Sequence, residues 1–333
     1  GIFNSLKYMA LIHKSGGGVG FSFSKLRPKG DLVQTTAGIA SGPVSFMRIY
    51  DTATEVIKQG GRRRGANMGI LNVNHPDILE FIKAKENKDI PLSNFNLSVA
   101  VDDIFIEKVQ TDGEIELINP RNQEVVKKIS ARTVFDLMVE MAWKTGDPGI
   151  LFLDEINRKN PTPKLGSIEA TNPCGEQPLL DYESCNLGSV NLARIVEDGE
   201  ILWDKLKDTV EIAVHFLDNV IDVNHYPLDE IKNHTLKTRK IGLGVMGFAD
   251  LLIKLGIPYN SWEALQVAEK IMKFISQMAR EASVELGKNK GSFPAFKGSK
   301  WDKEGYPAMR NATATTIAPT GSISIIAGVS SGI

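Results

Sequence analysis

Cysteine and histidine are both scarce in this chain of 333 residues. The two cysteines are Cys174 and Cys185, and a secreted scaffold held by disulfides would use more of them. The five histidines are scattered, and no group of cysteine and histidine has the spacing of a zinc site. We therefore expect a reducing, cytoplasmic environment and no metal centre built by the protein.

Long hydrophobic runs and an excess of charge of either sign are also absent. No apolar stretch is long enough to span a bilayer, and the chain does not open with a signal peptide. The formal net charge of -1 points to neither a nucleic acid nor an acidic membrane as a partner. Both ends lack the character of tails, so we expect a piece of a longer protein.

Helical and strand patterns alternate along the chain, which predicts a mixed α/β or α+β fold. The hydrophobic fraction of 42% is enough for a sizeable core. Ser130 and Asn260 or Ser261 are expected to begin helices, and Gly146 and Gly287 to end them. We expect helices over residues 1–14, 43–58, 76–85, 130–145, 201–223 and 260–286, strands over 19–24 and 94–99, and a hairpin over 105–128.

The stretch from Asn172 to Leu180 is the richest in turn and polar residues. Pro173 and Gly175 flank Cys174, so the cysteine is expected on a tight turn. In an extended loop, residues two apart project to one face, which would let Asn172, Cys174 and Glu176 converge on one small polar ligand. The alternative is a buried cysteine that acts as a small hydrophobe, and the density of polar neighbours favours the site.

The block from Asn172 to Ser189 resembles the finger loop of ribonucleotide reductases. Other segments resemble the same family in the same order, and they are residues 15–20, 60–67, 94–98, 145–149, 239–244 and 319–324. The resemblance spans the whole chain. It implies that residues 1–333 form an incomplete catalytic domain, an α/β fold that is most of a ten-stranded barrel with Cys174 on a central loop.

The resemblance also implies the reduction of ribonucleotides to 2′-deoxyribonucleotides. Cys174 corresponds to the cysteine that becomes a thiyl radical and takes a hydrogen atom from the 3′ carbon of the ribose. Glu176 corresponds to the carboxylate that accepts the 3′-hydroxyl proton, and Asn172 to the amide that holds the sugar hydroxyls. Cys185 corresponds to one half of a redox dithiol, whose other cysteine is expected before Gly1.

The residues around Cys174 resemble those of the class of the family that depends on adenosylcobalamin. Pro173 and the segment Gly175-Glu176-Gln177-Pro178 carry this likeness. The implied cofactor is adenosylcobalamin, which supplies the difficult radical step. Two alternatives stay open: a large subunit that receives its radical from a metal-containing partner, and a fragment that binds nucleotides without activity when isolated.

Further residues resemble the nucleotide-binding parts of the family. Backbone N–H groups and hydroxyls in one turn resemble the substrate diphosphate site, at Pro319, Thr320, Gly321, Ser322 and Ser324. The loop from Lys29 to Ser41 resembles one effector loop, and further effector contacts are implied at Arg27, Arg62, Arg63, Arg64 and Asn67. The implied partners are a ribonucleotide, a deoxynucleotide effector, a thioredoxin-like reductant and a second copy in a homodimer.

One motif points elsewhere. Residues 242–247 fit G-x-G-x-x-G, the fingerprint of dinucleotide-binding folds. That fingerprint needs a strand before it and an acidic residue after a second strand, and neither is expected here. Close packing of a helix is the preferred explanation of these glycines.

Overall fold

The computed structural model describes residues 1–33, 38–59, 63–86 and 92–333. The chain divides into two compact units. Unit 1 consists of Gly1–Lys159 and Ile168–Pro178, and unit 2 consists of Asn160–Ser167 and Leu179–Ile333. Each unit has its own large hydrophobic core.

A four-stranded parallel sheet forms the centre of unit 1, in the order β1-β6-β7-β10. The register pairs Val19 with Asn67, Asn67 with Phe95, and Gly149 with Ser98. The central strands β6 and β7 are buried over most of their length, as expected of parallel strands that are covered on both faces. The four strands are β1 (Val19–Ser22), β6 (Asn67–Asn72), β7 (Phe95–Val101) and β10 (Gly149–Phe152).

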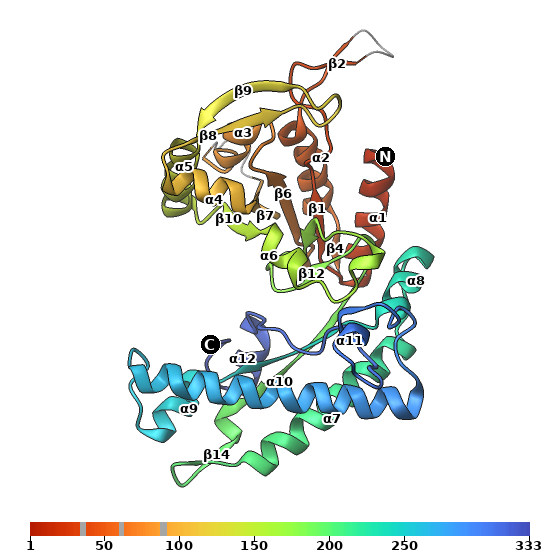
Figure 1. Cartoon of the computed structure of the whole chain (residues 1–333), viewed down its shortest axis with the longest axis vertical. Coiled ribbons are helices and arrows are strands. Elements are labelled where there is room, and N and C mark those ends of the chain that lie inside the picture. Colours follow the sequence, from red (N-terminus) through yellow and green to blue (C-terminus); the bar gives the residue numbers. More distant parts are fainter. Residues whose placement is uncertain (34–37, 60–62, 87–91) are drawn as a thin grey trace. The chain divides into compact units, whose positions relative to one another are not determined.

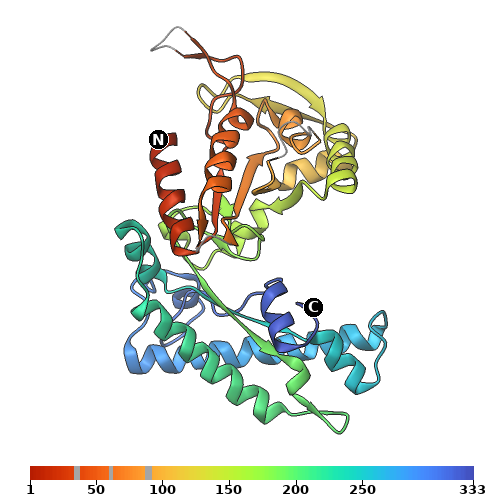
Figure 2. The same cartoon turned by 180° about the vertical axis from the view of Figure 1, so that it is seen from behind.

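Helices and short antiparallel pairs surround this sheet. Figures 1 and 2 show that α1 and α2 run side by side. The helices are α1 (Ile2–Ser15), α2 (Pro43–Val56), α3 (Ile78–Ile82), α4 (Asp103–Gln110), α5 (Ala131–Thr145) and α6 (Leu153–Arg158). The antiparallel pairs are β2 (Leu32–Val33) with β3 (Gly38–Ile39), β4 (Lys58–Gln59) with β5 (Arg63–Arg64), and β8 (Glu114–Ile118) with β9 (Val125–Ser130).

The predicted ends of α5 are confirmed. Ser130 Oγ accepts a hydrogen bond from Thr133 N, and Gly146 ends the helix with a left-handed φ of 85°. The hairpin expected over residues 105–128 is correct only in its second half. The first half is α4, because the Asp102 carboxylate accepts a hydrogen bond from Phe105 N at 2.7 Å and caps a helix that buries Phe105.

Unit 2 is built on two parallel strands, β13 (Asn186–Asn191) and β16 (Ile241–Met246), whose register pairs Asn186 with Ile241. Helices α7 and α10 pack along each other beside these strands (Figure 1). The helices of unit 2 are α7 (Trp203–Val223), α8 (Asp229–Thr238), α9 (Phe248–Leu255), α10 (Trp262–Lys290), α11 (Lys300–Lys303) and α12 (Gly321–Ala327). Smaller elements are the pair β14 (Val196–Glu197) and β15 (Glu200–Ile201), and the 3-10 turns Pro163–Leu165 and Leu192–Arg194. The prediction of a mixed α/β chain is thus confirmed.

Helix α10 begins as predicted and ends later. Ser261 Oγ accepts a hydrogen bond from Ala264 N at 3.1 Å and caps the helix. The stop expected at Gly287 is wrong, because the helix continues to Lys290. A Cβ at position 287 would lie 2.8 Å from Met309 N, so this glycine permits a close approach of two chain segments inside the helix.

The explanation of residues 242–247 by helix packing is also wrong. Most of the motif lies within the buried strand β16, where a Cβ at Gly244 would lie 2.7 Å from Thr316 O. Leu243 forms a parallel bridge with Thr315 on that neighbouring segment. Because Gly242 and Gly244 are strand residues, they do not form the phosphate-binding turn of a dinucleotide fold.

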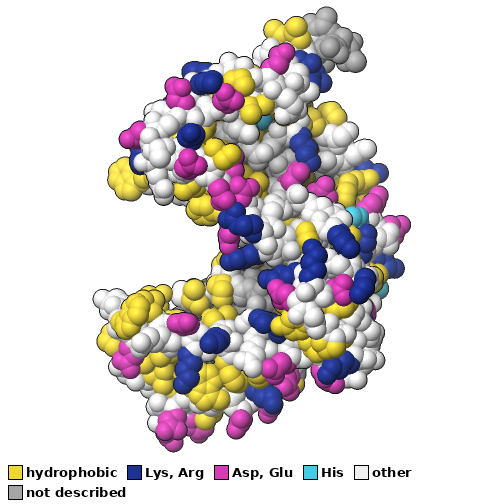
Figure 3. Space-filling view, in the orientation of Figure 1, with side chains coloured by type: hydrophobic (Ala, Val, Ile, Leu, Met, Phe, Trp, Pro, Cys, Tyr) yellow, Lys and Arg dark blue, Asp and Glu magenta, His cyan; other side chains and the backbone are white. Residues whose placement is uncertain are grey.

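Hydrophobic side chains gather on the surface of unit 2 over α9 and the start of α10 (Figure 3). The exposed members are Ile253, Tyr259, Trp262 and Leu265. Within the part of the chain that the structure describes, no helix combines the length and apolar character that a membrane span requires.

Candidate active site

Cys174 lies at the tip of a closed loop in unit 1. The loop joins β11 (Ala170–Thr171) to β12 (Pro178–Leu179), which pair with each other. Asn172 N donates to Gln177 O at 3.2 Å, and Gln177 N donates to Asn172 Oδ1 at 2.9 Å. Gly175 N donates to Asn172 O at 3.1 Å, and Gly175 has a φ of 84° that suits glycine. Asn172 therefore closes the loop through Oδ1, and Nδ2 is its remaining donor.

Two strands of the parallel sheet in unit 1, β1 and β7, contact this loop. Asn96 on β7 donates from Nδ2 to Pro173 O at 2.7 Å. A Cβ at Gly20 on β1 would collide with the carbonyl of Thr171, so only glycine allows the loop to lie this close to the strand. Sequence analysis assigned no role to Asn96, although a polar residue among the apolar residues of a buried strand is a usable signal.

The thiol of Cys174 is exposed and electrically neutral. Its pKa is raised above the ordinary value because the surrounding loop partly desolvates the sulfur, and because the negative charge of Glu176 disfavours a thiolate. Glu176 is half-buried. A protonated S–H group can give up a hydrogen atom, whereas nucleophilic catalysis by cysteine needs the thiolate.

Cys185 belongs to unit 2, whereas Cys174 belongs to unit 1. Its side chain is half-buried, and Sγ lies 3.5 Å from Asn186 O. The residue directly precedes β13. Both cysteines are reduced in the structure.

The predicted phosphate turn forms the start of α12 in unit 2. Thr320 adopts a left-handed conformation with a φ of 54°, and its Oγ1 accepts a hydrogen bond from Gly332 N at 2.7 Å. The Ser324 hydroxyl is buried and donates to Gly321 O at 3.1 Å. Pro319, Gly321 and Ser322 are exposed. Two of the predicted hydroxyls therefore hold the turn together, and the exposed part is the backbone around Gly321 and Ser322.

The predicted effector residues have different environments. Arg27 Nη1 donates to Leu32 O at 3.1 Å, and the exposed Arg64 forms an ion pair with Glu55 at 3.0 Å. Asn67 is fully buried, and its Nδ2 donates to Thr54 Oγ1 at 2.9 Å, so its side chain belongs to the core. Arg62 and part of the loop from Lys29 to Ser41 lie outside the described residues, as does the side chain of Arg63.

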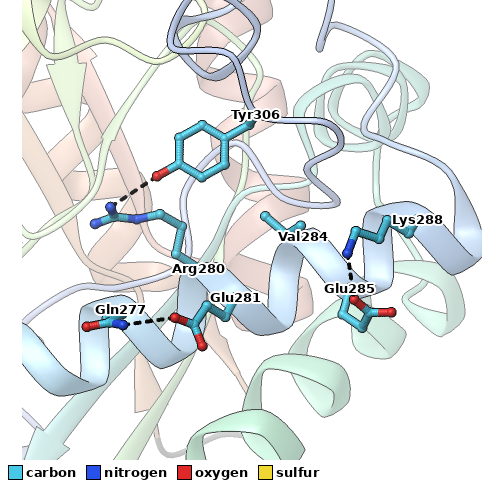
Figure 4. A pocket seen from close by; sticks show the side chains of 7 residues that line it. All are labelled: Gln277, Arg280, Glu281, Val284, Glu285, Lys288 and Tyr306. Atoms are coloured by element: carbon cyan, nitrogen blue, oxygen red, sulfur yellow. Dashed lines mark hydrogen bonds and ion pairs between the residues drawn. The ribbon is translucent and has the colours of Figure 1, made fainter.

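Two surface hollows accompany these features. One of about 550 Å³ lies in unit 1 beside the start of α2, and its charged lining includes Lys29, Arg48, Glu80 and Lys83. Another of about 360 Å³ lies along α10, where Arg280 donates to Tyr306 Oη and Lys288 pairs with Glu285 (Figure 4). These cations of the second hollow already have partners, which makes it a poor anion site.

Comparison with known proteins decides the family. Residues 1–333 match the family described as "Ribonucleotide reductase, barrel domain". The chain belongs to this ribonucleotide reductase family. The resemblance inferred from the sequence is thereby confirmed.

Similar proteins include reductases named for vitamin B12. The chain is 62% identical, over its full length, to the "Vitamin B12-dependent ribonucleoside-diphosphate reductase" of Thermoplasma acidophilum, of which it covers 43%. It is 52% identical to the protein of the same name from Mycobacterium tuberculosis (strain CDC 1551 / Oshkosh), of which it covers 48%. Identity to the "Ribonucleoside-diphosphate reductase large subunit" of Vaccinia virus is 34%, over 90% of the chain. The chain spans less than half the length of these relatives.

The reductase chain presents no ready metal site of its own in the described segments. Among residues 1–33, 38–59, 63–86 and 92–333, no group of three or more His, Cys, Asp or Glu side chains is arranged to hold a metal ion. The functional groups on the Cys174 loop are a thiol, a carboxylate and an amide.

Proposed function

We propose that the reductase to which this chain belongs converts ribonucleoside diphosphates to 2′-deoxyribonucleoside diphosphates by thiyl-radical chemistry. The observation that carries the proposal is the exposed Cys174 on a closed loop that also bears Asn172 and Glu176, and the raised pKa of its thiol agrees with it. The likeness to two reductases named as B12-dependent supports it. We further propose that both units are parts of one incomplete, ten-stranded barrel domain of a cytoplasmic protein.

Each residue of the loop has one task in this proposal. Cys174, as a thiyl radical, takes the hydrogen atom from the 3′ carbon of the ribose and later returns it. Glu176 accepts the proton of the 3′ hydroxyl, and Asn172 Nδ2 holds the sugar hydroxyls in place. The 2′ hydroxyl leaves as water, and the two electrons come from a dithiol that includes Cys185. The second thiol is supplied by another segment of the protein.

The proposed cofactor is adenosylcobalamin, and the residues fit it. Cys174 is the residue we place against it, because its S–H group is exposed and keeps its hydrogen atom near neutral pH. When bound, the cofactor supplies, by homolysis of its cobalt–carbon bond, the radical that removes this hydrogen atom. The protein's own contribution in this proposal is to hold the thiol in place at the tip of the closed loop.

Nucleotide binding is proposed at two places. The exposed backbone around Gly321 and Ser322 would take the substrate diphosphate, within the turn formed by Pro319, Thr320 and Ser324. Arg27 and Arg64, with Arg62 and Arg63, would contact a deoxynucleotide effector at a homodimer interface, because a guanidinium can donate paired hydrogen bonds to a phosphate. A thioredoxin-like protein would restore the dithiol.

The deciding experiment uses the full-length protein with adenosylcobalamin, a ribonucleoside diphosphate and a dithiol. The parent protein is expected to form deoxynucleotide without a second subunit, and Cys174→Ser to abolish this while nucleotide affinity stays unchanged. Cys185→Ser is the matched control. It is expected to complete at most one cycle with a thioredoxin-type reductant, because the reductant then has no protein disulfide to reduce.

Other outcomes identify the alternatives. Turnover by Cys174→Ser would remove the radical assignment. Activity that appears only with an added metal-containing subunit would assign the chain to the class that receives its radical from a partner. Repeated cycles by Cys185→Ser would exclude Cys185 from the redox dithiol.

A further inference from the structure

A buried ion pair in unit 2 has no part in the mechanism above. Lys240 Nζ lies 2.6 Å from Glu183 Oε2, and each side chain is only 1% exposed. Glu183 Oε1 makes no hydrogen bond in the structure. Burying two charges costs more than burying apolar side chains of the same size, so stability alone does not explain this pair. Such pairs are best understood by the geometry they impose.

The pair fixes a turn that leads to Cys185. Glu183 N donates to Leu180 O at 3.0 Å, and Leu180 N donates back to Glu183 Oε2 at 2.7 Å. Tyr182 within the turn has a φ of 61°, a conformation that a non-glycine residue adopts only when its surroundings hold it. The carboxylate oxygen that closes this turn is the one that Lys240 contacts.

The two residues that flank Cys185 form hydrogen bonds with two different helices. Ser184 Oγ lies 2.7 Å from Thr235 Oγ1 on α8, and Asn186 Nδ2 donates to Leu217 O on α7 at 3.1 Å. Asn186 and Ile241 are partners in the register of β13 and β16, so Cys185 and Lys240 each lie one residue before the paired strands. Lys240 therefore lies on the chain segment next to Cys185, the residue whose position we expect it to fix.

The residue before Lys240 is held by buried hydrogen bonds. The preceding Arg239 is buried and directs its guanidinium to Asp218 on α7, with Nη2 to Oδ1 at 2.8 Å and Nε to Oδ1 at 3.0 Å. Asn311 Nδ2 donates to Arg239 O at 3.0 Å. A continuous series of contacts thus runs from α7 through Arg239 and Lys240 to Glu183 and the Cys185 segment.

We propose that the Lys240–Glu183 pair is the positioning element of Cys185 and holds its thiol in place for disulfide exchange. The inference rests on the proposed role of Cys185. In each cycle, Cys185 and a second protein thiol form an S–S bond, releasing two protons and giving two electrons to the ribonucleotide. An added dithiol then reduces this bond and becomes a disulfide itself. Lys240 and Glu183 take no part in these bond changes.

Three variants of the full-length protein test the proposal. Lys240→Met leaves a buried carboxylate unpaired. Glu183→Leu combined with Lys240→Leu leaves no buried charge unpaired, so this double variant is expected to fold. Its melting temperature is expected to lie below that of the parent, because Leu180 N loses its acceptor. Lys128→Met is the control, because it breaks an exposed pair with Glu116 on the β8–β9 hairpin.

Two readouts distinguish positioning from stability. With dithiothreitol as reductant, kcat of the double variant is expected to fall at least about tenfold while KM for the ribonucleotide stays unchanged, since small misplacement of a reacting group is costly. Iodoacetamide labelling of Cys185, measured by mass spectrometry of its peptide, is expected to become severalfold faster. Labelling of Cys174 and all properties of Lys128→Met should equal those of the parent.

A folded double variant with the parent's kcat and the parent's Cys185 labelling rate would overturn the proposal. If Lys240→Met does not fold, the double variant alone decides. If the parent itself has no reductase activity, the proposed function fails, and the labelling of Cys185 still reports whether the pair holds this segment.

Discussion

Asn96 Nδ2 lies 2.7 Å from the carbonyl oxygen of Pro173, so a central strand of unit 1 holds the residue that directly precedes Cys174. Pro173 is buried, and its carbonyl accepts this hydrogen bond from β7. The position of the thiol therefore depends on a residue that is 77 residues away in the sequence.

Replacing Asn96 by leucine is expected to lower both activity and stability. A buried carbonyl left without its donor costs about 1–3 kcal/mol, so the free energy of unfolding should fall by that amount. We expect kcat of the full-length reductase to fall about tenfold, which corresponds to about 1.4 kcal/mol. Urea unfolding and steady-state rates measure the two effects. Asn122→Leu, on the exposed β8–β9 turn, should change neither, and equal effects of both substitutions would contradict the argument.

Glu176→Gln is expected to make Cys174 more reactive toward alkylation. Partial burial is the larger cause of the raised pKa of the thiol and stays in place, but the repulsion by the Glu176 carboxylate disappears. The pKa of Cys174 should therefore fall, and its labelling by iodoacetamide at pH 8 should become faster. In a Cys185→Ser background, Cys174 is the sole thiol of the chain. Glu169→Gln is the control, and an unchanged pH profile in Glu176→Gln would refute the electrostatic explanation.

Asp218→Ala is expected to destabilise unit 2 strongly. Asp218 is fully buried and accepts hydrogen bonds from Arg239, Arg310 and Asn311. Its removal leaves the half-exposed Asp222 as the remaining carboxylate partner of Arg239 among the described residues and takes an acceptor from the buried Asn311 Nδ2, which is expected to cost up to about 3 kcal/mol. Asp222→Ala, at a carboxylate that is 46% exposed, should cost no more than about 1 kcal/mol. Urea unfolding compares the two variants, and similar losses would disprove the dominant role of Asp218.

His75 is expected to make unit 1 less stable at acid pH. Its Nε2 lies 2.9 Å from Leu26 O, and its Nδ1 accepts a hydrogen bond from Asp77 N at 3.1 Å, which requires a neutral ring. Burial lowers the pKa of His75 below 6.5. The unfolded chain therefore binds a proton that the folded chain does not, and stability is lost as the pH falls below 6.5, by at most about 1.4 kcal/mol per pH unit.

Urea unfolding between pH 5 and pH 8 tests this effect, with His75→Gln expected to show the flatter profile. The pKa of Asp77 is raised by burial, so this carboxyl acts in the opposite sense as the pH rises above 3.8, and it is present in the parent and in His75→Gln alike. The exposed His225 provides the control substitution His225→Gln. Identical slopes in the parent and in His75→Gln would rule out His75 as the source.

Local signals in the sequence were enough to predict several elements. Ser130 and Gly146 bound α5 as expected, because capping and a left-handed C-terminus depend on neighbouring residues alone. The tight turn at Cys174 was likewise predicted from Pro173 and Gly175. The helix end predicted at Gly287 was wrong. A glycine is needed there because Met309 lies close by in space, and the sequence pattern does not reveal that neighbour.

The supports of the candidate site could not be predicted in the same way. Lys240 and Glu183 are 57 residues apart, and Asn96 and Pro173 are 77 residues apart. Asn67 was expected to contact an effector, and its place in β6 buries its side chain. Pairings at such separations are determined by the sheet register and the packing of whole elements, which short motifs do not encode.

The absence of a side chain at residue 20 limits which substitutions this chain can accept there. Even alanine there would push the carbonyl of Thr171 away from β1 and carry the tip of the loop with it. Position 20 can therefore change only together with the loop that it supports, although it contributes no functional group. Natural variation in the loop should accordingly be coupled to variation in this strand.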